Sequence, residues 1–204
     1  MTITRIGHSG IAVEHDGITL VFDFYTDPAD LTHDILLRST RSYVMVSHSH
    51  RDHLCHDIFG WYNHYPNRIA HYLIANECRR KLRRATDLSD LPVTYLHHDE
   101  DWTDGRLTLH TFGSTDVGVS FLATIGGRTI FHAGDFTCRD IEGETTDSRK
   151  ARGDFHAILR TIAAYAPHIH VVLMPVVPNM GGDWAYGPRE FLRAIHVDHF
   201  IPMH

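Results

Sequence analysis

Hydrophobic and polar positions alternate over short stretches at the start of the chain. A period of two is typical of strands that bury one face, and glycine-containing turns separate the stretches. We predict an antiparallel meander of three strands, at residues 2–6, 11–14 and 18–24.

The pattern changes in the middle of the chain. Residues 43–46 form a continuous apolar run, which favours a strand buried on both faces. We predict another strand at residues 69–74. Segments 31–37, 58–64 and 77–85 have helical spacing. This part therefore alternates between strands and helices.

Strand patterns dominate again from residue 93 onward. Gly126-Gly127 predicts a tight hairpin between two apolar strands. We predict strands at residues 93–96, 107–112, 119–125, 129–133, 171–174 and 199–203, a long loop at 136–154, and helices at 155–165 and 188–195. Two strand-rich halves with helices predict one domain over residues 1–204, built from two packed sheets with helices outside.

Composition adds one unusual number to this picture of an ordinary globular chain. Histidine accounts for 19 of 204 residues, whereas hydrophobic residues make up 43% and charged residues 22%. The net charge of -6 does not favour a nucleic-acid partner. The histidine excess points to metal binding or pH sensing.

Cysteine usage and hydropathy bear on the compartment. Three cysteines without a CxxC pair do not form a disulfide framework, and no apolar run is long enough to span a membrane. The first residues also lack the pattern of a secretory signal. We therefore expect a cytoplasmic protein without membrane partners.

The densest chemistry follows the apolar run at 43–46. His48, His50, Asp52 and His53 form the pattern H-x-H-x-D-H. Residues two apart on an extended segment project to one side, so His48 and His50 can converge on one ion. At this chain's own His and Asp frequencies, about 0.015 chance matches are expected. The pattern therefore indicates a divalent metal site of imidazole and carboxylate ligands.

Together with further motifs, this pattern resembles the metallo-β-lactamase-fold hydrolases along the whole chain. An early strand closes on Asp23 in LVFDFY, Asp135 lies in TIFHAGD, and His204 ends HFIPMH. GHSGIAVEHDG, HAGD and IPMH look most like the small cytoplasmic branch that includes ascorbate-6-phosphate lactonase. The resemblance implies an α/β (α+β) protein with a four-layer αββα sandwich of two mixed sheets flanked by helices.

The resemblance also implies a ligand set and a reaction. His48 and His50 would belong to a first metal, Asp52, His53 and His204 to a second, with Asp135 bridging. Asp23 would orient the ligand loop by hydrogen bonds. A hydroxide between the metals would attack the substrate, and Asp52 would help to move protons as the catalytic residue. The implied metals are one or two Zn²⁺.

One family position differs. The family's third ligand is a His in a turn, whereas Ser114 occupies that position here. A neutral hydroxyl is a weak ligand for a transition metal. Asp116 is the natural substitute and His110 the second choice. With Asp116 as a ligand, the more oxygen-rich site would tolerate Mn²⁺ or Fe²⁺.

Other features are open to two readings. The basic run 79–84 is either a phosphate-recognition patch or a solvated helix face, and the acidic and His-rich 97–101 is read as a surface loop. Cys55 and Cys138 either line a pocket or are buried and inert. Trp184 and Tyr186, in the glycine-rich 181–187, either cover the metals or pack. His8, in a Gly-His-Ser-Gly turn, is a candidate for the pocket rim.

These observations predict a metal-dependent hydrolase of an ester, lactone or phosphodiester, with a small molecule as its partner. The alternative is a degenerate, non-catalytic metal-binding protein, which Ser114 favours. The final position of His204 would, at a natural terminus, also place an α-carboxylate beside the metal. A homo-oligomer is left open. His50 argues against an oxidoreductase of the flavodiiron kind, which would normally have Glu there.

Overall fold

The computed structural model describes residues 1–138, 146–178 and 183–204, and divides into two compact units. Unit 1 spans Met1–His97 and unit 2 spans His98–His204. Each unit is built around one mixed sheet of six strands. The two mixed sheets with flanking helices match the predicted fold class, whereas a single domain over residues 1–204 stays a prediction.

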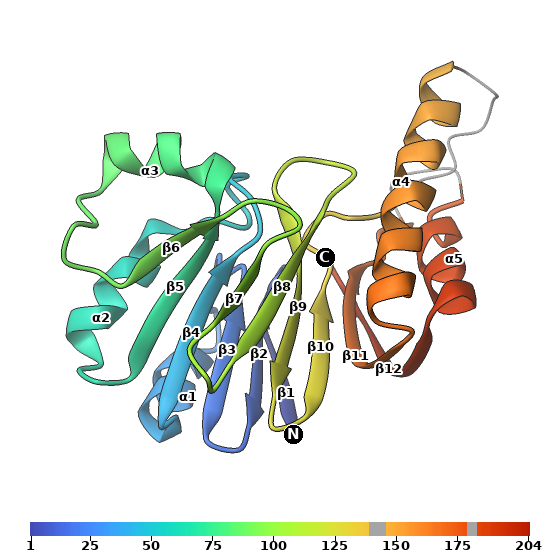
Figure 1. Cartoon of the computed structure of the whole chain (residues 1–204). Helices are drawn as coiled ribbons and strands as arrows, with labels where there is room; N and C mark the ends of the chain where they lie inside the picture. The colour runs from blue at the N-terminus through green and yellow to red at the C-terminus, as the bar shows by residue number, and fades with distance from the viewer. Residues whose placement is uncertain (139–145, 179–182) are drawn as a thin grey trace. The chain divides into compact units, whose positions relative to one another are not determined.

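The sheet of unit 1 has its strands in sequence order (Figure 1). Its first two pairings are antiparallel and the remaining three are parallel. All strands except the second therefore run the same way, and their carboxyl ends meet at one edge. The strands are β1 (Thr2–Gly7), β2 (Gly10–His15), β3 (Ile18–Phe22), β4 (Arg41–Val46), β5 (Ile69–Ala75) and β6 (Val93–Leu96).

The helices of unit 1 follow from local chemistry. The carboxylate of Asp27 accepts the backbone N–H groups of Leu31 and Thr32 at 3.0 and 2.7 Å, which satisfies two free donors at a helix start. Phe24 packs edge-on against Trp61, with ring centroids 4.7 Å apart. The helices are α1 (Leu31–Arg38), α2 (Trp61–His64) and α3 (Arg79–Ala85), with 3-10 turns η1 (His56–Gly60) and η2 (Asn76–Cys78).

Unit 2 orders its strands β12-β11-β10-β9-β8-β7. The last three pairings in that order are antiparallel, whereas β10, β11 and β12 are parallel. Strands β8, β10, β11 and β12 therefore run the same way. The strands are β7 (Asp101–Thr103), β8 (Thr108–Gly113), β9 (Val119–Ile125), β10 (Arg128–His132), β11 (His168–Pro175) and β12 (His196–Met203).

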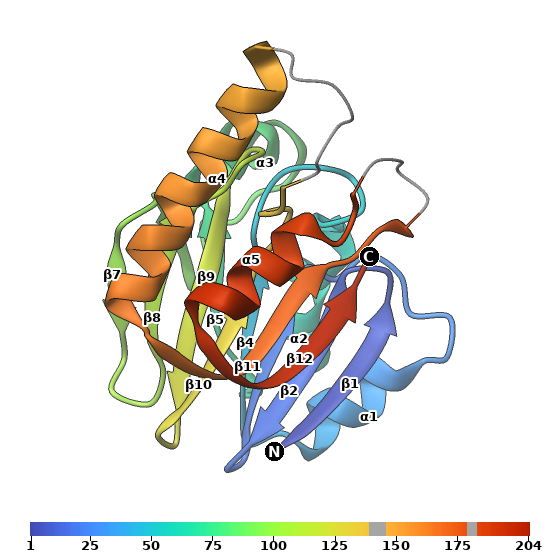
Figure 2. The same ribbon diagram turned by 90° about the vertical axis from the view of Figure 1, so that its right-hand side faces the viewer.

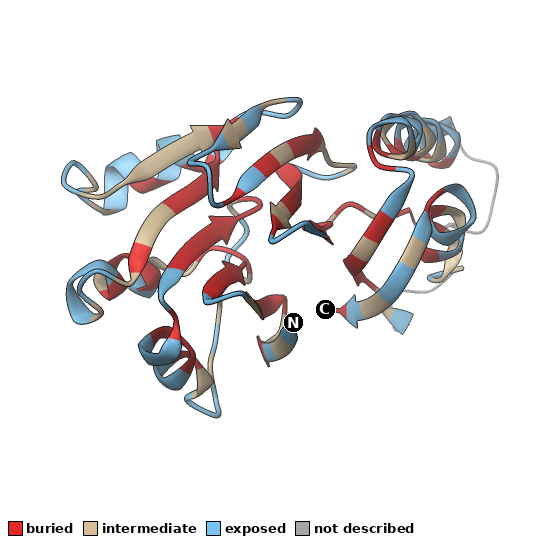
Figure 3. Cartoon of the chain, turned by 60° about the horizontal axis from the view of Figure 1, so that its bottom comes forward, coloured by how far each residue is buried: buried red, intermediate tan, exposed pale blue. Residues whose placement is uncertain are grey.

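Two helices cover this sheet, α4 (Thr146–Tyr165) and α5 (Tyr186–Ala194) (Figure 2). Phe155 of α4 stacks on Phe136 at a centroid distance of 4.8 Å, and Phe191 of α5 lies 5.2 Å from Phe131. In both units most buried positions lie on the strands, and each helix combines buried with exposed positions (Figure 3). Hydrophobic burial therefore holds the helices on the sheets.

Most predicted elements are confirmed, including the hairpin at Gly126-Gly127, where both residues have positive φ. The loop predicted at 136–154 is wrong from Thr146 onward, where α4 begins, and 139–145 lie outside the described residues. This helical stretch is polar, so no apolar stripe marks it. For the same reason β7 was not predicted, and β11 and β12 begin earlier than expected.

Within the described residues, no helix is both long and apolar enough to cross a membrane.

Candidate metal centre

The candidate residues of unit 1 follow strands that end at the same edge of the sheet. His8 follows β1, Asp23 follows β3, the loop 47–53 follows β4, and Glu77 follows β5. Because these strands all run the same way, their side chains gather although they come from distant parts of the sequence. Asp23 and His8 have φ of 43° and 50°, in the left-handed region that non-glycine residues rarely adopt. Such backbone is often found at functional sites.

Asp23 is fully buried and holds the loop 47–53 through hydrogen bonds. Its Oδ1 accepts the backbone N–H of Ser47 at 2.7 Å, and its Oδ2 accepts the Ser47 hydroxyl at 2.6 Å. The His53 Nδ1 lies 2.8 Å from the same Oδ2. A carboxylate can only accept, so Nδ1 carries the proton and the lone pair of His53 is on Nε2. This is the orientation in which a carboxylate fixes a metal-binding imidazole.

His48 is oriented through Ser47. The Ser47 hydroxyl gives its one proton to Asp23, so it accepts from His48 Nδ1 at 2.9 Å. The lone pair of His48 is therefore on Nε2, which lies 3.0 Å from His50 Nδ1. Two nitrogens at about 2.0–2.1 Å from one tetrahedral ion would be roughly 3.3–3.4 Å apart. His48 and His50 thus fit a shared ion after a shift of a few tenths of an ångström.

Asp52 is held by His8, whose Nε2 lies 3.0 Å from Asp52 Oδ2. Partial burial alone would raise the pKa of Asp52, but hydrogen bonds from its own backbone N–H and from His8, with the nearby His53, lower it. Asp52 is therefore a carboxylate near neutral pH, suited to bind a cation or accept a proton. The hydroxyl of Ser9 lies 3.4 Å from His53 Nε2.

The turn of the ligand loop is fixed at both ends. His53 and Leu54 both donate backbone N–H groups to the His50 carbonyl, at 3.1 and 3.0 Å, which bends the chain so that His53 turns back. Ser49 donates its N–H to Glu77 at 2.5 Å and accepts Lys81 Nζ on its carbonyl at 2.6 Å. Both neighbours of Ser49 are predicted ligands, so this clamp limits their movement.

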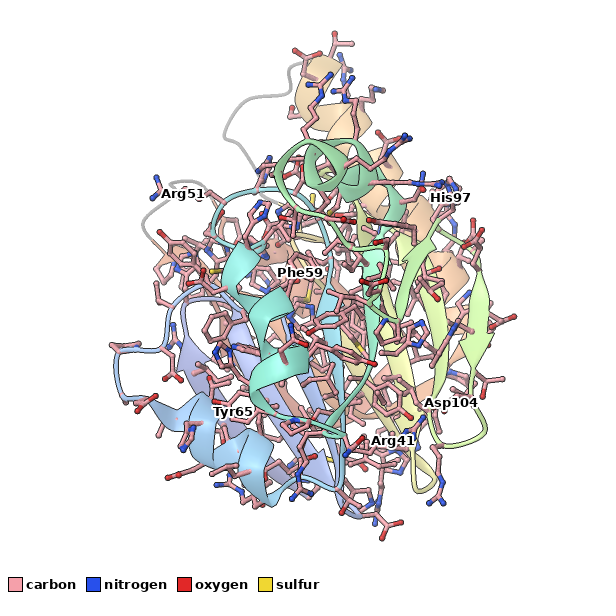
Figure 4. The ribbon with its side chains drawn as sticks, turned by 90° about the vertical axis from the view of Figure 1, so that its left-hand side faces the viewer. Arg41, Arg51, Phe59, Tyr65, His97 and Asp104 are labelled. Atoms are coloured by element: carbon pink, nitrogen blue, oxygen red, sulfur yellow. The ribbon has the colours of Figure 1, made fainter. Side chains whose placement is uncertain are left out.

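Like His50, Arg51 is an exposed residue of the loop 47–53. It points away from the body of its unit (Figure 4).

The candidate residues of unit 2 also lie at strand ends. Ser114 and Asp116 follow β8, Asp135 follows β10, and His204 follows β12, and these strands run the same way. One ligand atom of Asp116 lies within 4.8 Å of one of Asp135. His204 Nε2 lies 3.5 Å from Asp135 Oδ1. The structure therefore brings the predicted substitute for the missing His to the predicted bridging carboxylate.

Hydrogen bonds hold the turn of Asp116 in place. The Thr115 hydroxyl donates to the Thr137 carbonyl at 2.7 Å and accepts the Thr137 N–H at 3.1 Å. Thr137 is two residues after Asp135, so the two segments are tied next to their carboxylates. The Ser114 hydroxyl accepts the N–H of Asp116 at 3.3 Å. Ser114 thus supports the turn that presents Asp116.

His110, the second choice for the missing ligand, is engaged in other contacts. Its Nδ1 lies 2.8 Å from Asp101 Oδ1, and its ring stacks on Tyr165 at 4.1 Å. Among the described residues, the groupings with metal-ligand spacing that contain Asp135 include Asp116 and His204 but not His110. Asp116 is therefore the better-supported candidate.

The donor atoms in each unit suit a divalent metal. In unit 1 one ligand atom each of Asp23, His48 and His53 lies within 4.8 Å of the others, and unit 2 supplies two carboxylates and a His. Imidazole with carboxylate suits Zn²⁺, and more oxygen favours Mn²⁺ or Fe²⁺. The metal-ligand roles of these residues stay predictions.

A cavity of about 500 Å³ lies in unit 2 beside the turn of Ser114 and Asp116. Phe112 and Ile158 give it an apolar wall, and His98 and Asp99 add polar groups. This volume is typical of small-molecule pockets.

The remaining candidates divide between packing and exposure. Burial raises the pKa of Cys55, so it stays a thiol, and Cys138 is buried. The Tyr186 hydroxyl lies 2.9 Å from His156 Nε2, which favours packing, whereas Trp184 is exposed. Residues 181 and 182 lie outside the described residues.

Three contacts were not predicted from the sequence. These are the contact of His8 with Asp52, the hydrogen bonds that link His48 to Asp23 through the Ser47 hydroxyl, and the hydrogen bonds of Ser49 with Glu77 and Lys81. The position of His8 in a turn at the end of a strand was the only sequence feature that pointed to one of them.

Comparisons with known proteins bear on the fold and on the relatives of the chain. No protein-family model matches the chain. A UPF0173 metal-dependent hydrolase of Desulforamulus reducens is 27% identical over 218 residues, covering 100% of this chain and 84% of the relative.

Two solved structures show the fold. Igni18, a metallo hydrolase of Ignicoccus hospitalis, has a TM-score of 0.68 at 18% identity, covering 99% of this chain and 81% of its own. The metallo-β-lactamase fold protein YhfI of Bacillus subtilis has a TM-score of 0.65 at 12% identity, covering 97% and 78%. The chain therefore has the metallo-β-lactamase fold, and it resembles metal-dependent hydrolases from end to end.

Proposed function

We propose that this protein is a metal-dependent hydrolase that cleaves an ester, lactone or phosphodiester bond in a small molecule. The observation that supports this most strongly is the buried carboxylate of Asp23, which directs the lone pairs of His48 and His53 through hydrogen bonds. Burying a carboxylate is costly unless it is hydrogen-bonded and paired, as Asp23 is, and such buried ionisable clusters are enriched at functional sites. When bound, divalent metal supplies a hydroxide nucleophile at neutral pH and polarises the bond to be cleaved.

The chain's own residues orient the ligands and move protons. Asp23 and Ser47 fix the ring orientation of His53 and His48, and the Ser49 clamp holds the backbone between His48 and His50. Asp52, ionised at neutral pH, is both a ligand and the group that accepts a proton during the reaction. His8 holds Asp52 in position from the neighbouring turn.

The proposed metal ligands are those that the sequence predicted, with Asp116 replacing the missing third His. The position of Asp116 beside Asp135 within unit 2 supports this assignment. Zn²⁺ suits the imidazole ligands, and the additional carboxylate makes Mn²⁺ or Fe²⁺ acceptable.

A small-molecule substrate in a reducing compartment fits the remaining observations. The cavity of unit 2 beside Ser114 and Asp116 has the volume of a small-molecule site, and its apolar wall would bind the non-reacting part of the substrate. All three cysteines are free, which supports a cytoplasmic setting.

A second candidate function is metal binding without catalysis. The observation that favours it is Ser114, which puts a neutral hydroxyl where the family has an imidazole ligand.

Metal content together with turnover tests the proposal. We expect one to two metals per chain after loading, together with hydrolysis of bis(p-nitrophenyl) phosphate or a chromogenic lactone. Asp52→Ala should reduce kcat/KM by at least about a hundredfold, the usual contribution of a positioned proton acceptor. Asp90→Ala is the matched control, since it removes an exposed carboxylate of the same unit.

The two candidates give different results. Turnover lost in Asp52→Ala but kept in Asp90→Ala supports the hydrolase. Metal bound without any turnover supports the non-catalytic alternative, and neither metal nor turnover contradicts both.

A further inference from the structure

The strongest local concentration of charge in unit 1 lies on α3. Five of its seven residues are basic, and all five side chains are exposed, whereas Leu82 alone is fully buried. Without these five cations the chain would have 14 basic against 25 acidic residues, a net charge of -11. The helix is therefore a positive region on an otherwise acidic protein. The five are Arg79, Arg80, Lys81, Arg83 and Arg84.

This arrangement opposes the stability of the helix itself. Arg79 and Arg83, like Arg80 and Arg84, are four residues apart, so like charges are neighbours on the helix surface. The first turn of α3 holds cations and no acid, which is unfavourable at the positive end of a helix, whereas Arg83 and Arg84 lie in the last turn, where cations are favourable. A merely solvated face would gain from alternating signs of charge. Breaking a local rule in this way is expected where a ligand compensates.

The arginines border two hollows. One has a volume of about 780 Å³, and Thr86, Ser89 and Tyr95 also line it. The other has a volume of about 680 Å³. Arg79, Arg83 and Arg84 line both. Guanidinium groups with neighbouring hydroxyls match the oxygens of phosphate groups, which arginine binds in a bidentate manner.

The acids that border the hollows are already engaged. Asp87 accepts the N–H of Ser89 at 3.1 Å, and Glu77 accepts the N–H of Ser49 at 2.5 Å. Within the described part of the chain, the side chains of Arg83 and Arg84 make no hydrogen bond or ion pair. Their guanidinium donors are thus available to a ligand.

The basic helix is joined to the candidate metal loop. Glu77, in the 3-10 turn η2 that leads into α3, holds the N–H of Ser49, and Lys81 of α3 holds its carbonyl. Ser49 lies between the predicted ligands His48 and His50. A ligand bound on α3 is therefore recognised next to the loop proposed to hold the metal (Figure 1).

We propose that the α3 surface binds the phosphate groups of a small substrate that carries two or more phosphates. This inference rests on the proposed function for the reaction, but the binding itself needs no turnover. The volumes are within the range of small-molecule sites, and the net charge of -6 opposes a long polyanion. A small oligophosphate compound is therefore favoured over a nucleic acid.

Titration of the full-length protein with sodium tripolyphosphate tests the proposal, with the metal-loaded and the chelator-treated protein measured in parallel. The double variant R83Q/R84Q should weaken binding at least about tenfold in both forms, because two charge-assisted contacts are lost. The control R149Q/R160Q, which removes two exposed cations from α4, should change the Kd by less than about twofold. Glutamine is a good helix former, so R83Q/R84Q should fold and melt no lower than the parent.

Three results overturn the proposal: no saturable binding in the parent, equal weakening in both double variants, or tighter binding of a single-stranded oligouridylate than of tripolyphosphate at physiological salt. The last result would identify a nucleic-acid surface. The turnover assay separates the two proposals. Tripolyphosphate binding that depends on Arg83 and Arg84, without turnover, contradicts the hydrolase but not the binding surface. Turnover without such binding contradicts the surface alone.

Discussion

The two units present their candidate ligands in different ways. In unit 1 one loop carries most of them, and Asp23, Ser47 and Ser49 fix it through short hydrogen bonds from side chains and backbone. In unit 2 the candidates come from three separate strand ends, with Asp135 and His204 3.5 Å apart. The first arrangement depends on a buried network and the second on strand order. Substitutions of the site residues in unit 1 should therefore lower the free energy of unfolding. Substitutions of those in unit 2 should mainly weaken metal binding.

The largest effect is expected from Asp23→Ala. It leaves the Ser47 N–H and the His53 ring buried without their acceptor, which should cost about 3–5 kcal/mol of unfolding free energy. The matched variant Asp135→Ala, in unit 2, should cost less than about 1 kcal/mol. Urea unfolding of chelator-treated protein measures both. Equal losses would remove the proposed difference between the units.

Metal affinity should respond most strongly in unit 2. Asp116→Ala should weaken Zn²⁺ binding at least about tenfold, or about 1.4 kcal/mol, because a ligand is lost. Ser114→His introduces the imidazole expected from the resemblance to metallo-β-lactamase-fold hydrolases and should strengthen binding by a similar factor. Competition with a chromogenic chelator measures the Kd. An unchanged Kd in Asp116→Ala would exclude Asp116 as the substitute ligand.

A smaller effect is expected at the start of α1. The carboxylate of Asp27 is partly buried, which alone would raise its pKa, but hydrogen bonds from Thr32 and Leu31 lower the pKa below 3.8. A lowered pKa means that the stabilisation is complete above the unfolded-state pKa and is lost as pH falls through the folded one. Asp27→Ala should cost about 1 kcal/mol at pH 7, and the difference from the parent should shrink below about pH 4. Thermal melts at both pH values measure this.

The smallest effect is expected from an exposed pair of unit 2. The pKa of Asp198 is lowered chiefly by the hydrogen bond with His168, whose Nε2 lies 2.8 Å away. Because the side chains of His168 and Asp198 are 45% and 32% exposed, solvent weakens their interaction, and Asp198→Asn should lower the melting temperature less than Asp27→Ala does. A larger shift would show that unit 2 also depends on polar contacts for its stability.

The elements predicted correctly from the sequence are those whose side chains are buried. The apolar runs of β4, β5 and β9 and the hairpin at Gly126-Gly127 were predicted because their side chains are covered on both faces or need positive φ. The pattern did not predict the first half of α4 or the starts of β11 and β12. Their residues are largely polar and exposed, so the hydrophobic pattern gives no period there.

The candidate site shows the same division. H-x-H-x-D-H is a local pattern, so its location was predicted from the sequence, and Asp23 followed from the family resemblance. The contact of His8 with Asp52 joins residues 44 apart, and the contact of Ser49 with Glu77 joins residues 28 apart. No local pattern encodes such pairs.

The amino-acid sequence alone predicts the chemical groups of the candidate site: a loop of candidate metal ligands after an apolar strand, an early carboxylate, and a basic run with two possible roles. Which of these groups lie close together follows from the fold. Parallel strand order in unit 1 brings His8, Asp23 and Glu77 to the loop, and in unit 2 it brings Asp116 and His204 to Asp135. The reason is physical, because side chains are specified residue by residue, whereas strand order follows from burying all apolar faces together.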